Sequence, residues 1–164
     1  MPQLIKKRKK DRIPKKRIVV LYHKNCSDGF GAAWAAWKKF GRKAEYIAVE
    51  PRGLPLYLLK LENKNIFTLD NSFTLNNLKR LIRQRNEITI IDHHSSSEKA
   101  IKSAPNYIFD IKHSGAILAW RYFHPRKKIP RILLHIEDVD LWKFKLPYTR
   151  EIFAGLDELE FEFK

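Results

Sequence analysis

The sequence predicts an α/β protein with a mostly parallel β-sheet of about five strands and helices on both faces. Short apolar segments rich in β-branched residues alternate along the chain with longer segments of helical periodicity. Such alternation gives parallel strands joined by helical crossovers that cover both faces of the sheet. The chain has 164 residues, of which 44% are apolar, and is long enough for a single domain with a buried core.

Five segments have the composition of buried strands. Residues 17–22 (RIVVLY) and 87–91 (EITII) are dominated by Ile, Val, Thr and Tyr, which suit a pleated, buried surface. Residues 65–69 (NIFTL) have the same character and end directly at Asp70. In chain order, the predicted strands are residues 17–22, 44–49, 65–69, 87–91 and 107–111.

Six further segments are predicted helices. Residues 30–40 are rich in alanine, a strong helix former, and stop at Gly41. Residues 75–85 carry leucines at helical spacing, and Ser114 is a suitable N-cap for the helix that Pro125 ends. In chain order, the predicted helices are residues 30–40, 54–61, 75–85, 98–103, 114–123 and 130–137.

Charge and periodicity divide the chain into three parts. Residues 1–17 hold nine Lys or Arg against one Asp and show no periodic pattern, so residues 1–16 are predicted to be a disordered basic tail. Residues 17–150 form the predicted domain. Residues 151–164, in which acidic and apolar residues alternate near the end, are predicted to start an incomplete C-terminal element.

The net charge of +15 predicts an anionic partner such as nucleic acid, a nucleotide or polyphosphate. The basic tail is expected either to contact nucleic acid or to act only as a solubilising extension. A single cysteine, Cys26, excludes an internal disulfide framework and fits a reducing compartment. No apolar run approaches the ~20 residues that span a bilayer, and no leader pattern is found, so a cytoplasmic location is expected.

Carboxylates and imidazoles follow the carboxyl ends of three predicted strands. Open α/β sheets place their chemistry at this edge. Several carboxylates that met there would repel one another unless cations lay between them. The candidate ligands are His23, Asp28, Asp70, Asp92, His93, His94, Asp138 and Asp140.

This mixture of histidine and carboxylate suits Mn²⁺, Fe²⁺ or Zn²⁺ better than Ca²⁺. The number of ligands suits two ions about 3.5–4 Å apart, the arrangement used for in-line displacement at phosphorus. Each residue also has an ordinary explanation, since Asp28 fits a turn, Asp70 a helix cap and Asp138 a solvated helix end.

The ordered motifs around Asp92-His93-His94 resemble the DHH phosphoesterase superfamily. The match covers about residues 17–145 and includes His23, Asp28-Gly29 and Asp70 upstream and Asp138 downstream. This family includes single-strand exonucleases of the RecJ type, oligoribonucleases, cyclic-dinucleotide phosphodiesterases and family II pyrophosphatases. The resemblance implies a parallel sheet and a hydrolase that uses two Mn²⁺ ions, with Zn²⁺, Fe²⁺ or Mg²⁺ as alternatives.

The resemblance also implies a role for each matched residue. Asp70 would bridge the two metal ions in catalysis, and His94 would contact the scissile phosphate or assist the leaving group. Asp92 would orient the histidines without binding metal, and Asp140 is grouped with it. The expected metal ligands are His23, Cys26, Asp28, Asp70, His93 and Asp138.

Two features depart from the family pattern. The first motif usually reads Asp-x-Asp after a histidine, whereas here Cys26-Ser27-Asp28 replaces the first carboxylate with a cysteine. Cys26 is therefore either a thiolate ligand, which favours Zn²⁺ or Fe²⁺, or a small buried side chain. Family members also usually carry a C-terminal domain with a Gly-rich basic clamp, which this chain lacks, so a fragment or a minimal form is expected.

These features predict a metal-dependent phosphohydrolase that cleaves phosphodiester bonds of short oligonucleotides or nucleotides with a metal-activated water. The alternatives are a pyrophosphate or polyphosphate hydrolase and a catalytically weak nucleic-acid or nucleotide-binding module. Trp142 is a candidate for stacking on a base, although core packing is favoured. The candidate phosphate contacts are Lys24, Lys112, His113, Ser114 and Arg121.

Overall fold

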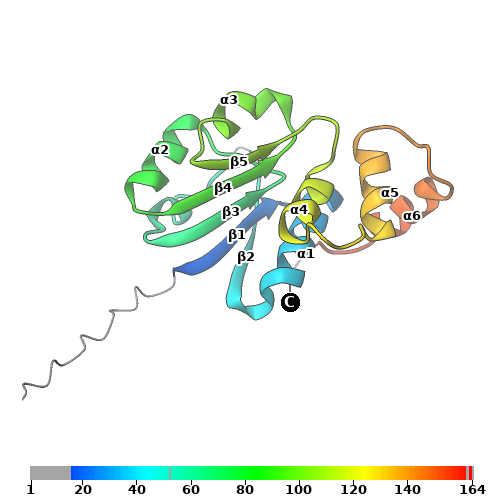
Figure 1. The fold of residues 1–164 in the computed structure, drawn as a ribbon, viewed down its shortest axis with the longest axis horizontal. Coiled ribbons are helices and arrows are strands. Elements are labelled where there is room, and N and C mark those ends of the chain that lie inside the picture. Colours follow the sequence, from blue (N-terminus) through cyan, green and yellow to red (C-terminus); the bar gives the residue numbers. More distant parts are fainter. Residues whose placement is uncertain (1–15, 52, 162, 164) are drawn as a thin grey trace, which may run out of the picture.

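Five parallel strands form one sheet in the order β2-β1-β3-β4-β5 in a computed structural model that describes residues 16–51, 53–161 and 163 (Figure 1). Each predicted strand is present with its ends shifted by at most two residues, which confirms the predicted fold class. The strands are β1 (Arg17–His23), β2 (Ala44–Val49), β3 (Lys64–Leu69), β4 (Glu87–Asp92) and β5 (Asn106–Phe109).

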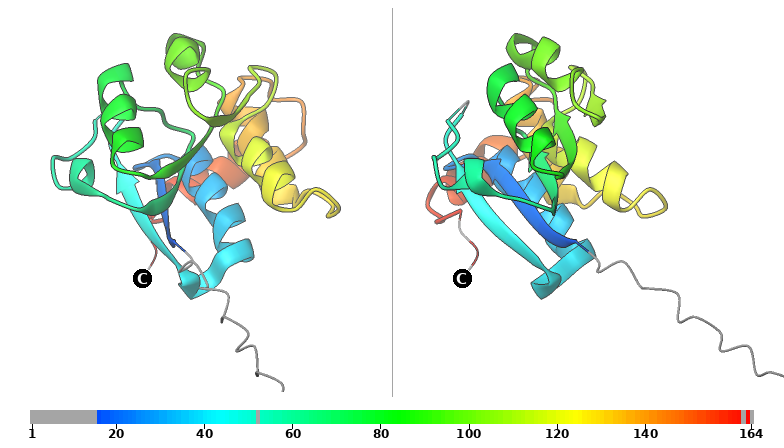
Figure 2. Two further views of the ribbon diagram at one scale, coloured as in Figure 1. Left: turned by 60° about the vertical axis from the view of Figure 1, so that its left-hand side comes forward. Right: turned by 90° about the vertical axis from the view of Figure 1, so that its left-hand side faces the viewer.

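Helices cover both faces of this sheet (Figure 2). Successive residues of β1 point to opposite faces, so Val20 packs with α1 (Ser27–Phe40) and α4 (Gly115–Phe123). Val19 packs on the other face with α2 (Leu75–Arg83) and the segment that includes α3 (Glu98–Ile101). Burial on both faces explains why the strands read as continuous apolar runs.

Helix α1 lies unusually close to α4 because both present small residues at their contact. A Cβ atom added at Gly31 would lie 3.0 Å from the Cβ of Ala116. Four alanines of α1 are fully buried, which lets the helix pack flat on the sheet. The close approach brings the N-termini of α1 and α4 together at the carboxyl edge of the sheet.

Two further helices, α5 (Arg131–Asp140) and α6 (Thr149–Asp157), lie beside this layer (Figure 1). Helix α5 packs against α1 and α4, and α6 packs against α5. The sequence analysis does not predict α6. After α6 the chain returns to the sheet, where the ring of Phe163 lies 4.6 Å from that of Tyr46. Whether residues 151–164 begin a longer element stays a prediction.

Several helix boundaries differ from the predicted ones. Helices α2 and α3 each end two residues earlier than predicted, and three further differences have larger consequences. Helix α1 begins at Ser27, so Asp28 lies in its first turn, and α5 continues to Asp140. Residues 54–61 form only a short turn of helix, because Pro55 and the nearby Pro51 and Gly53 disfavour a longer one. Short turns of 3-10 helix in the described part of the chain are η1 (Gly41–Lys43), η2 (Leu58–Lys60) and η3 (Ser95–Ser97).

Two remaining predictions concern the N-terminal basic tail and membrane-spanning segments. The predicted basic tail falls outside the described residues, except for Lys16, whose Nζ lies 3.0 Å from Glu87 Oε1. Within the described residues, no helix has the length and apolar character needed to cross a membrane.

Candidate metal centre

The first part of the site is the turn that joins β1 to α1. His23 ends β1, and its Nδ1 lies 3.3 Å from Oδ2 of Asp70. A Cβ atom at Gly29 would lie 2.5 Å from the carbonyl oxygen of His23, so only glycine lets α1 begin so close to the strand end. This tight turn places Cys26 and Asp28 beside His23.

Asp28 is buried, and its carboxylate accepts hydrogen bonds from the first backbone N–H groups of α4. Gly115 N donates to Oδ2 at 2.6 Å, and Ala116 N donates to Oδ1 at 2.9 Å. A negative charge at a helix N-terminus is favourable, and these bonds fix the orientation of the carboxylate. Burial, and then the charges of Asp70 and Asp140, nevertheless raise the pKa of Asp28 well above its usual range.

Asp70 lies at the centre of the site, directly after β3. Its Oδ2 is 3.3 Å from His23 Nδ1 and 3.7 Å from Cys26 Sγ, whereas its Oδ1 is 3.3 Å from His93 Nε2. Burial would raise the pKa of Asp70, but His23 and His93 outweigh that effect and lower it to about 2. Its backbone has a φ of 52°, a strained value for a residue other than glycine.

Asp92 holds the two histidines that follow it. Its Oδ1 accepts hydrogen bonds from the backbone N–H of His93 at 2.7 Å, from that of His94 at 3.1 Å, and from His94 Nδ1 at 2.7 Å. The hydrogen bond that His94 donates to Asp92 raises the pKa of His94. These contacts fix the positions of both histidines, and the orienting role of Asp92 stays a prediction.

His93 points inward at three carboxylates. Its Nε2 lies 3.3 Å from Asp70 Oδ1, 3.5 Å from Asp140 Oδ2 and 3.7 Å from Asp28 Oδ2. Burial lowers the pKa of His93, but the contact with Asp70 and the neighbouring negative charges raise it to about 9. Both histidines of the triplet lie near Asp70 Oδ1, but His93 also faces Asp28 and Asp140, whereas His94 also faces Asp92.

Within the described residues, the side chains form three sets whose donor atoms all lie within 4.8 Å of one another. The sets share Asp70 or His93, so they make one continuous centre. They are His23 with Cys26 and Asp70; Asp28 with His93 and Asp140; and Asp70 with Asp92, His93 and His94.

These donors fit divalent cations because the centre contains buried polar atoms that no hydrogen bond satisfies. Asp70 Oδ1, Asp92 Oδ2 and His93 Nε2 are all buried without a hydrogen-bond partner in the described part of the chain. Unpaired buried polar atoms are costly, and a coordinated cation would satisfy them. Imidazole, thiol and carboxylate together suit Zn²⁺, Fe²⁺ or Mn²⁺.

The structure reverses the positions expected for Asp138 and Asp140. Both oxygens of Asp138 accept hydrogen bonds from the chain after α5, namely from Lys145 N, Leu146 N and Thr149 Oγ1 at 2.8–3.0 Å. Asp140 reaches His93 instead. The error arises because α5 extends three residues further than predicted, and residues two apart on a helix point in different directions.

The predicted phosphate contacts are dispersed. Lys24 Nζ pairs with Glu50 at 3.2 Å, and Arg121 lies in the last turn of α4, at the end opposite Gly115. Ser114 is buried as the N-cap of α4, where its hydroxyl accepts a hydrogen bond from Ile117 N. His113 Nδ1 lies 3.0 Å from Glu137 Oε2. Lys112 is exposed.

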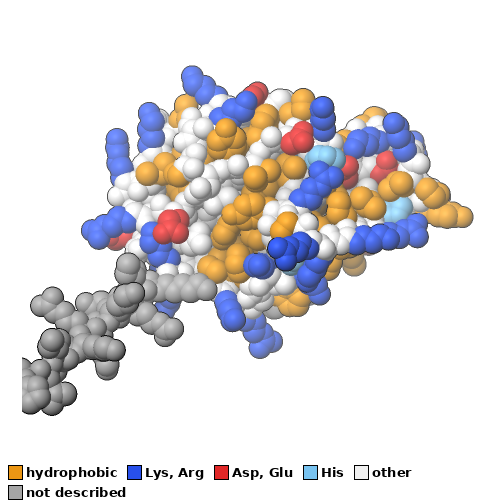
Figure 3. Space-filling view, viewed as in Figure 1, with side chains coloured by type: hydrophobic (Ala, Val, Ile, Leu, Met, Phe, Trp, Pro, Cys, Tyr) orange, Lys and Arg blue, Asp and Glu red, His pale blue; other side chains and the backbone are white. Residues whose placement is uncertain are grey.

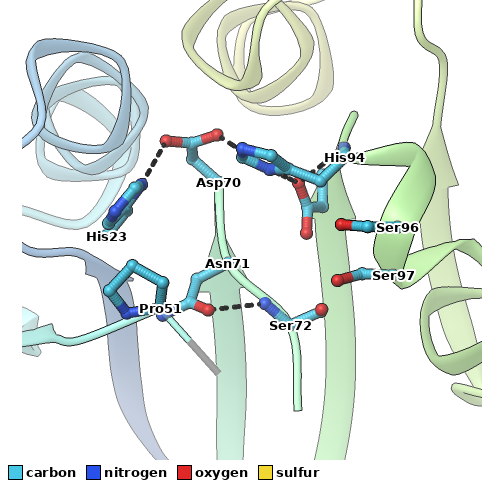
Figure 4. A pocket seen from close by; sticks show the side chains of 9 residues that line it. His23, Pro51, Asp70, Asn71, Ser72, His94, Ser96 and Ser97 are labelled. Atoms are coloured by element: carbon cyan, nitrogen blue, oxygen red, sulfur yellow. Dashed lines mark hydrogen bonds and ion pairs between the residues drawn. The ribbon is translucent and has the colours of Figure 1, made fainter. Parts of the chain in front are cut away.

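A cavity of about 300 Å³, lined mainly by residues with polar side chains, opens beside the centre (Figure 4). His23, Asp70, Asp92 and His94 form one side of it. The rest of the lining was not predicted, although the run of three serines after the triplet could have indicated it. Those residues are Pro51, Asn71, Ser72, Ser96 and Ser97.

Gly115 is a further residue that the sequence analysis missed. A Cβ atom there would lie 2.7 Å from Asp70 Cβ and 2.9 Å from both Asp28 Oδ2 and Asp70 Oδ1. Glycine therefore allows α4 to approach both central carboxylates. Its only sequence signal is its position directly after the N-cap Ser114.

Comparisons with other proteins establish the fold. An uncharacterized protein from Helicobacter pylori G27 has a similar structure, with a TM-score of 0.64 over 79% of this chain and 45% of that one, at 17% sequence identity. The uncharacterized protein R106 of Acanthamoeba polyphaga mimivirus is 36% identical over 162 residues, and the match covers 88% of this chain. The chain spans about 38% of the length of that relative. No family model matches the chain.

Proposed function

We propose that this chain is the metal-binding domain of a DHH-type phosphoesterase that hydrolyses phosphodiester bonds in short oligonucleotides or nucleotides. The observation that carries the proposal is the position of Asp70. One of its buried oxygens lies toward His23 and Cys26, and the other toward His93 and the carboxylates near it. A carboxylate placed between two donor sets is suited to bridge two divalent cations.

The two donor sets differ in chemistry. His23, Cys26 and Asp70 would hold one cation, and Asp28, His93, Asp140 and the second oxygen of Asp70 would hold the other. The thiol makes the first set softer, which favours Zn²⁺ or Fe²⁺ there, whereas the second set of carboxylates and one imidazole suits Mn²⁺. Bound cations would supply an acidic water and stabilise negative charge on a phosphoryl group.

His94 is placed to act on the substrate. It lines the cavity, and Asp92 accepts a hydrogen bond from its Nδ1, so Nδ1 carries a proton. Nε2 is thereby left for the substrate. The raised pKa of His94 favours the imidazolium, which can donate a hydrogen bond to a phosphate or a proton to a leaving oxygen.

The volume of the cavity limits the size of the substrate group that it can hold. About 300 Å³ is at the lower end of ligand pockets and is enough for one phosphate and part of a nucleotide. Ser72, Ser96 and Ser97 line the cavity on the side opposite His23 (Figure 4). The net charge of +15 favours a polyanion over a small inorganic substrate, although pyrophosphate or polyphosphate remains the alternative substrate.

The test compares Asp70→Asn with Asp157→Asn, which replaces an exposed carboxylate at the end of α6. Elemental analysis measures bound metal, and hydrolysis is measured with Mn²⁺ or Zn²⁺ on a short labelled RNA, a cyclic dinucleotide and pyrophosphate. We expect Asp70→Asn to abolish turnover and reduce bound metal, and Asp157→Asn to behave as the wild type. Near wild-type turnover in Asp70→Asn would refute the bridging role, and metal binding without turnover of any substrate would favour a binding module.

A further inference from the structure

The loop of residues 141–148, which joins α5 to α6, exposes aromatic side chains instead of burying them. Trp142 is 79% exposed and Tyr148 is 72% exposed, so the favoured prediction of core packing for Trp142 is wrong. Figure 3 shows hydrophobic side chains projecting at the end of the molecule formed by α5 and α6, with Lys and Arg side chains beside them. Exposing large rings in this way contributes nothing to a core.

The backbone of this loop is strained and held in place. Trp142, Phe144 and Tyr148 have φ values of 53°, 47° and 65°, a region that bulky residues rarely adopt. The backbone carbonyl of Asp138 accepts hydrogen bonds from the N–H groups of Lys143 and Phe144 at 2.8 and 3.1 Å. Such strain persists only where the surroundings enforce it, and it concentrates at binding sites.

The Asp138 side chain completes this support. Its carboxylate binds the second half of the loop, and Thr149 Oγ1, which donates to it, also lies 2.8 Å from His135 Nδ1. Asp138 thus fixes both halves of the loop, the first through its backbone carbonyl and the second through its buried carboxylate. The exposed rings are therefore displayed on a rigid support, so little side-chain and backbone entropy is lost on binding a ligand.

The ring geometry leaves a face of Trp142 open. The rings of Trp142 and Phe144 meet edge to face at an interplanar angle of 83° with centroids 5.0 Å apart, so this contact covers at most one face of the indole. The guanidinium of Arg150 lies 4.4 Å from the centroid of Phe144. An open aromatic face beside a cation is the pattern that stacks on nucleobases.

Charge and position indicate what this surface binds. Lys145 lies between Phe144 and Tyr148 in the loop, and Arg150 follows it. Lys143 Nζ, by contrast, is paired with Glu137 Oε1 at 3.0 Å. Trp142 is only two residues beyond Asp140, which contacts His93 in the metal centre. The loop therefore begins next to the metal centre, which gives a strand bound there by one phosphate a nearby surface for its other bases.

We propose that the 141–148 loop binds the bases of a single-stranded nucleic acid, with Trp142 as the stacking residue and Lys145 and Arg150 beside the phosphate backbone. The inference rests on the proposed function in one respect, namely that the bound strand is the substrate of the metal centre. Stacking of its bases on the loop requires no hydrolysis. A double-stranded helix, whose bases are already stacked on one another, does not offer the free base face that Trp142 requires.

The test measures binding of two single strands of equal length in the presence of EDTA, where hydrolysis cannot occur. One strand carries thymine bases and the other is abasic, so the phosphate charge is the same in both. Stacking on a base contributes about 1–3 kcal/mol, so the thymine strand should bind the wild type at least about fivefold more tightly. Trp142→Ala should remove that preference, and Trp142→Phe should keep most of it.

Trp37→Ala is the matched control, since Trp37 is 41% exposed and lies 5.9 Å from Lys38 Nζ, but sits in the last turn of α1, away from the metal centre. It should keep the preference for the thymine strand. Lys145→Gln should weaken binding of both strands equally and flatten the salt dependence. Metal content and melting temperature of Trp142→Ala should match the wild type.

Three results would overturn the inference. The first is equal affinity of the wild type for the two strands, and the second is an unchanged preference for the thymine strand in Trp142→Ala. The third is that Trp142→Ala changes only the oligomeric state measured by sedimentation, which would make the loop an interface between copies of the chain. Because none of these measurements involves turnover, failure of the hydrolase proposal leaves the base-binding result readable, and the reverse also holds.

Discussion

Replacing Gly115 with alanine tests whether the N-terminus of α4 positions the central carboxylates. The added Cβ would lie 2.7 Å from the Cβ of Asp70, whereas an unstrained carbon contact needs about 3.5 Å, so one group must move by about 0.8 Å. It would also lie 2.9 Å from Asp28 Oδ2, an atom that Gly115 N holds by a hydrogen bond. The substitution thus disturbs both carboxylates at once.

A shift of this size matters because metal–ligand distances tolerate deviations of about 0.2 Å. Disturbing the groups that orient metal ligands typically costs about 10- to 100-fold in metal affinity, and we expect a loss in this range for Gly115→Ala. Overpacking of a buried contact costs about 1–3 kcal/mol of unfolding free energy. For a domain of this length, each kcal/mol lowers the melting temperature by about 2–4 °C.

The assay is calorimetric titration of the metal-free protein with Zn²⁺ or Mn²⁺, together with thermal unfolding. Gly155→Ala is the control, because a Cβ there meets nothing within 4 Å and Gly155 lies inside α6. It should keep metal affinity and gain about 0.5–1 kcal/mol of stability from helix propensity. Wild-type metal affinity in Gly115→Ala would refute the idea that α4 positions the carboxylates.

Two further predictions concern protons and the thiol. The pKa of Asp28 lies above its usual range and that of His93 is raised to about 9, so both groups hold protons that a bound metal ion would displace. Metal binding should therefore release protons, and metal affinity should rise from pH 6 toward pH 9. Calorimetric titrations in buffers of different ionisation enthalpy measure this release, and its absence would contradict the prediction. Burial, and then Asp70, raise the pKa of Cys26 to about 12, so its thiolate forms only on coordination. The Co²⁺-loaded protein should show a thiolate-to-metal charge-transfer band that Cys26→Ser abolishes. Cys26→Asp should shift the metal preference toward Mn²⁺. If Cys26→Ser keeps the same band, Cys26 is not a ligand and serves only in packing.

Local sequence was sufficient to predict the strands and the edge at which the ligands meet. Val19 and Val20 in β1 are both buried because helices cover both faces, and this leaves a plain apolar run in the sequence. The predicted ends of β3 and β4 fall directly before Asp70 and the Asp92-His93-His94 triplet. In a parallel sheet these ends must share one edge, so the centre followed from chain order.

Helix ends and exposure were harder to predict, because several residues compete for each role. Asp138 and Asp140 are equally good ligands by type, and the choice between them depends on the residue at which α5 ends. Trp142 follows them with a composition typical of a core, yet the turn held by Asp138 directs it to solvent. These outcomes depend on hydrogen bonds between distant residues, which hydrophobic periodicity does not report.

The sequence by itself determined the parallel α/β fold and the gathering of His23, Asp70 and His93 at one sheet edge, since hydrophobic periodicity and strand order depend on local composition. Only the tertiary structure decided that Asp140 replaces Asp138 in the centre, and that Gly115 brings the N-terminus of α4 against Asp28 and Asp70. Those choices depend on helix phase and on close packing between segments about 90 residues apart in the chain, such as Asp28 and Gly115, whose contact spans 87 positions.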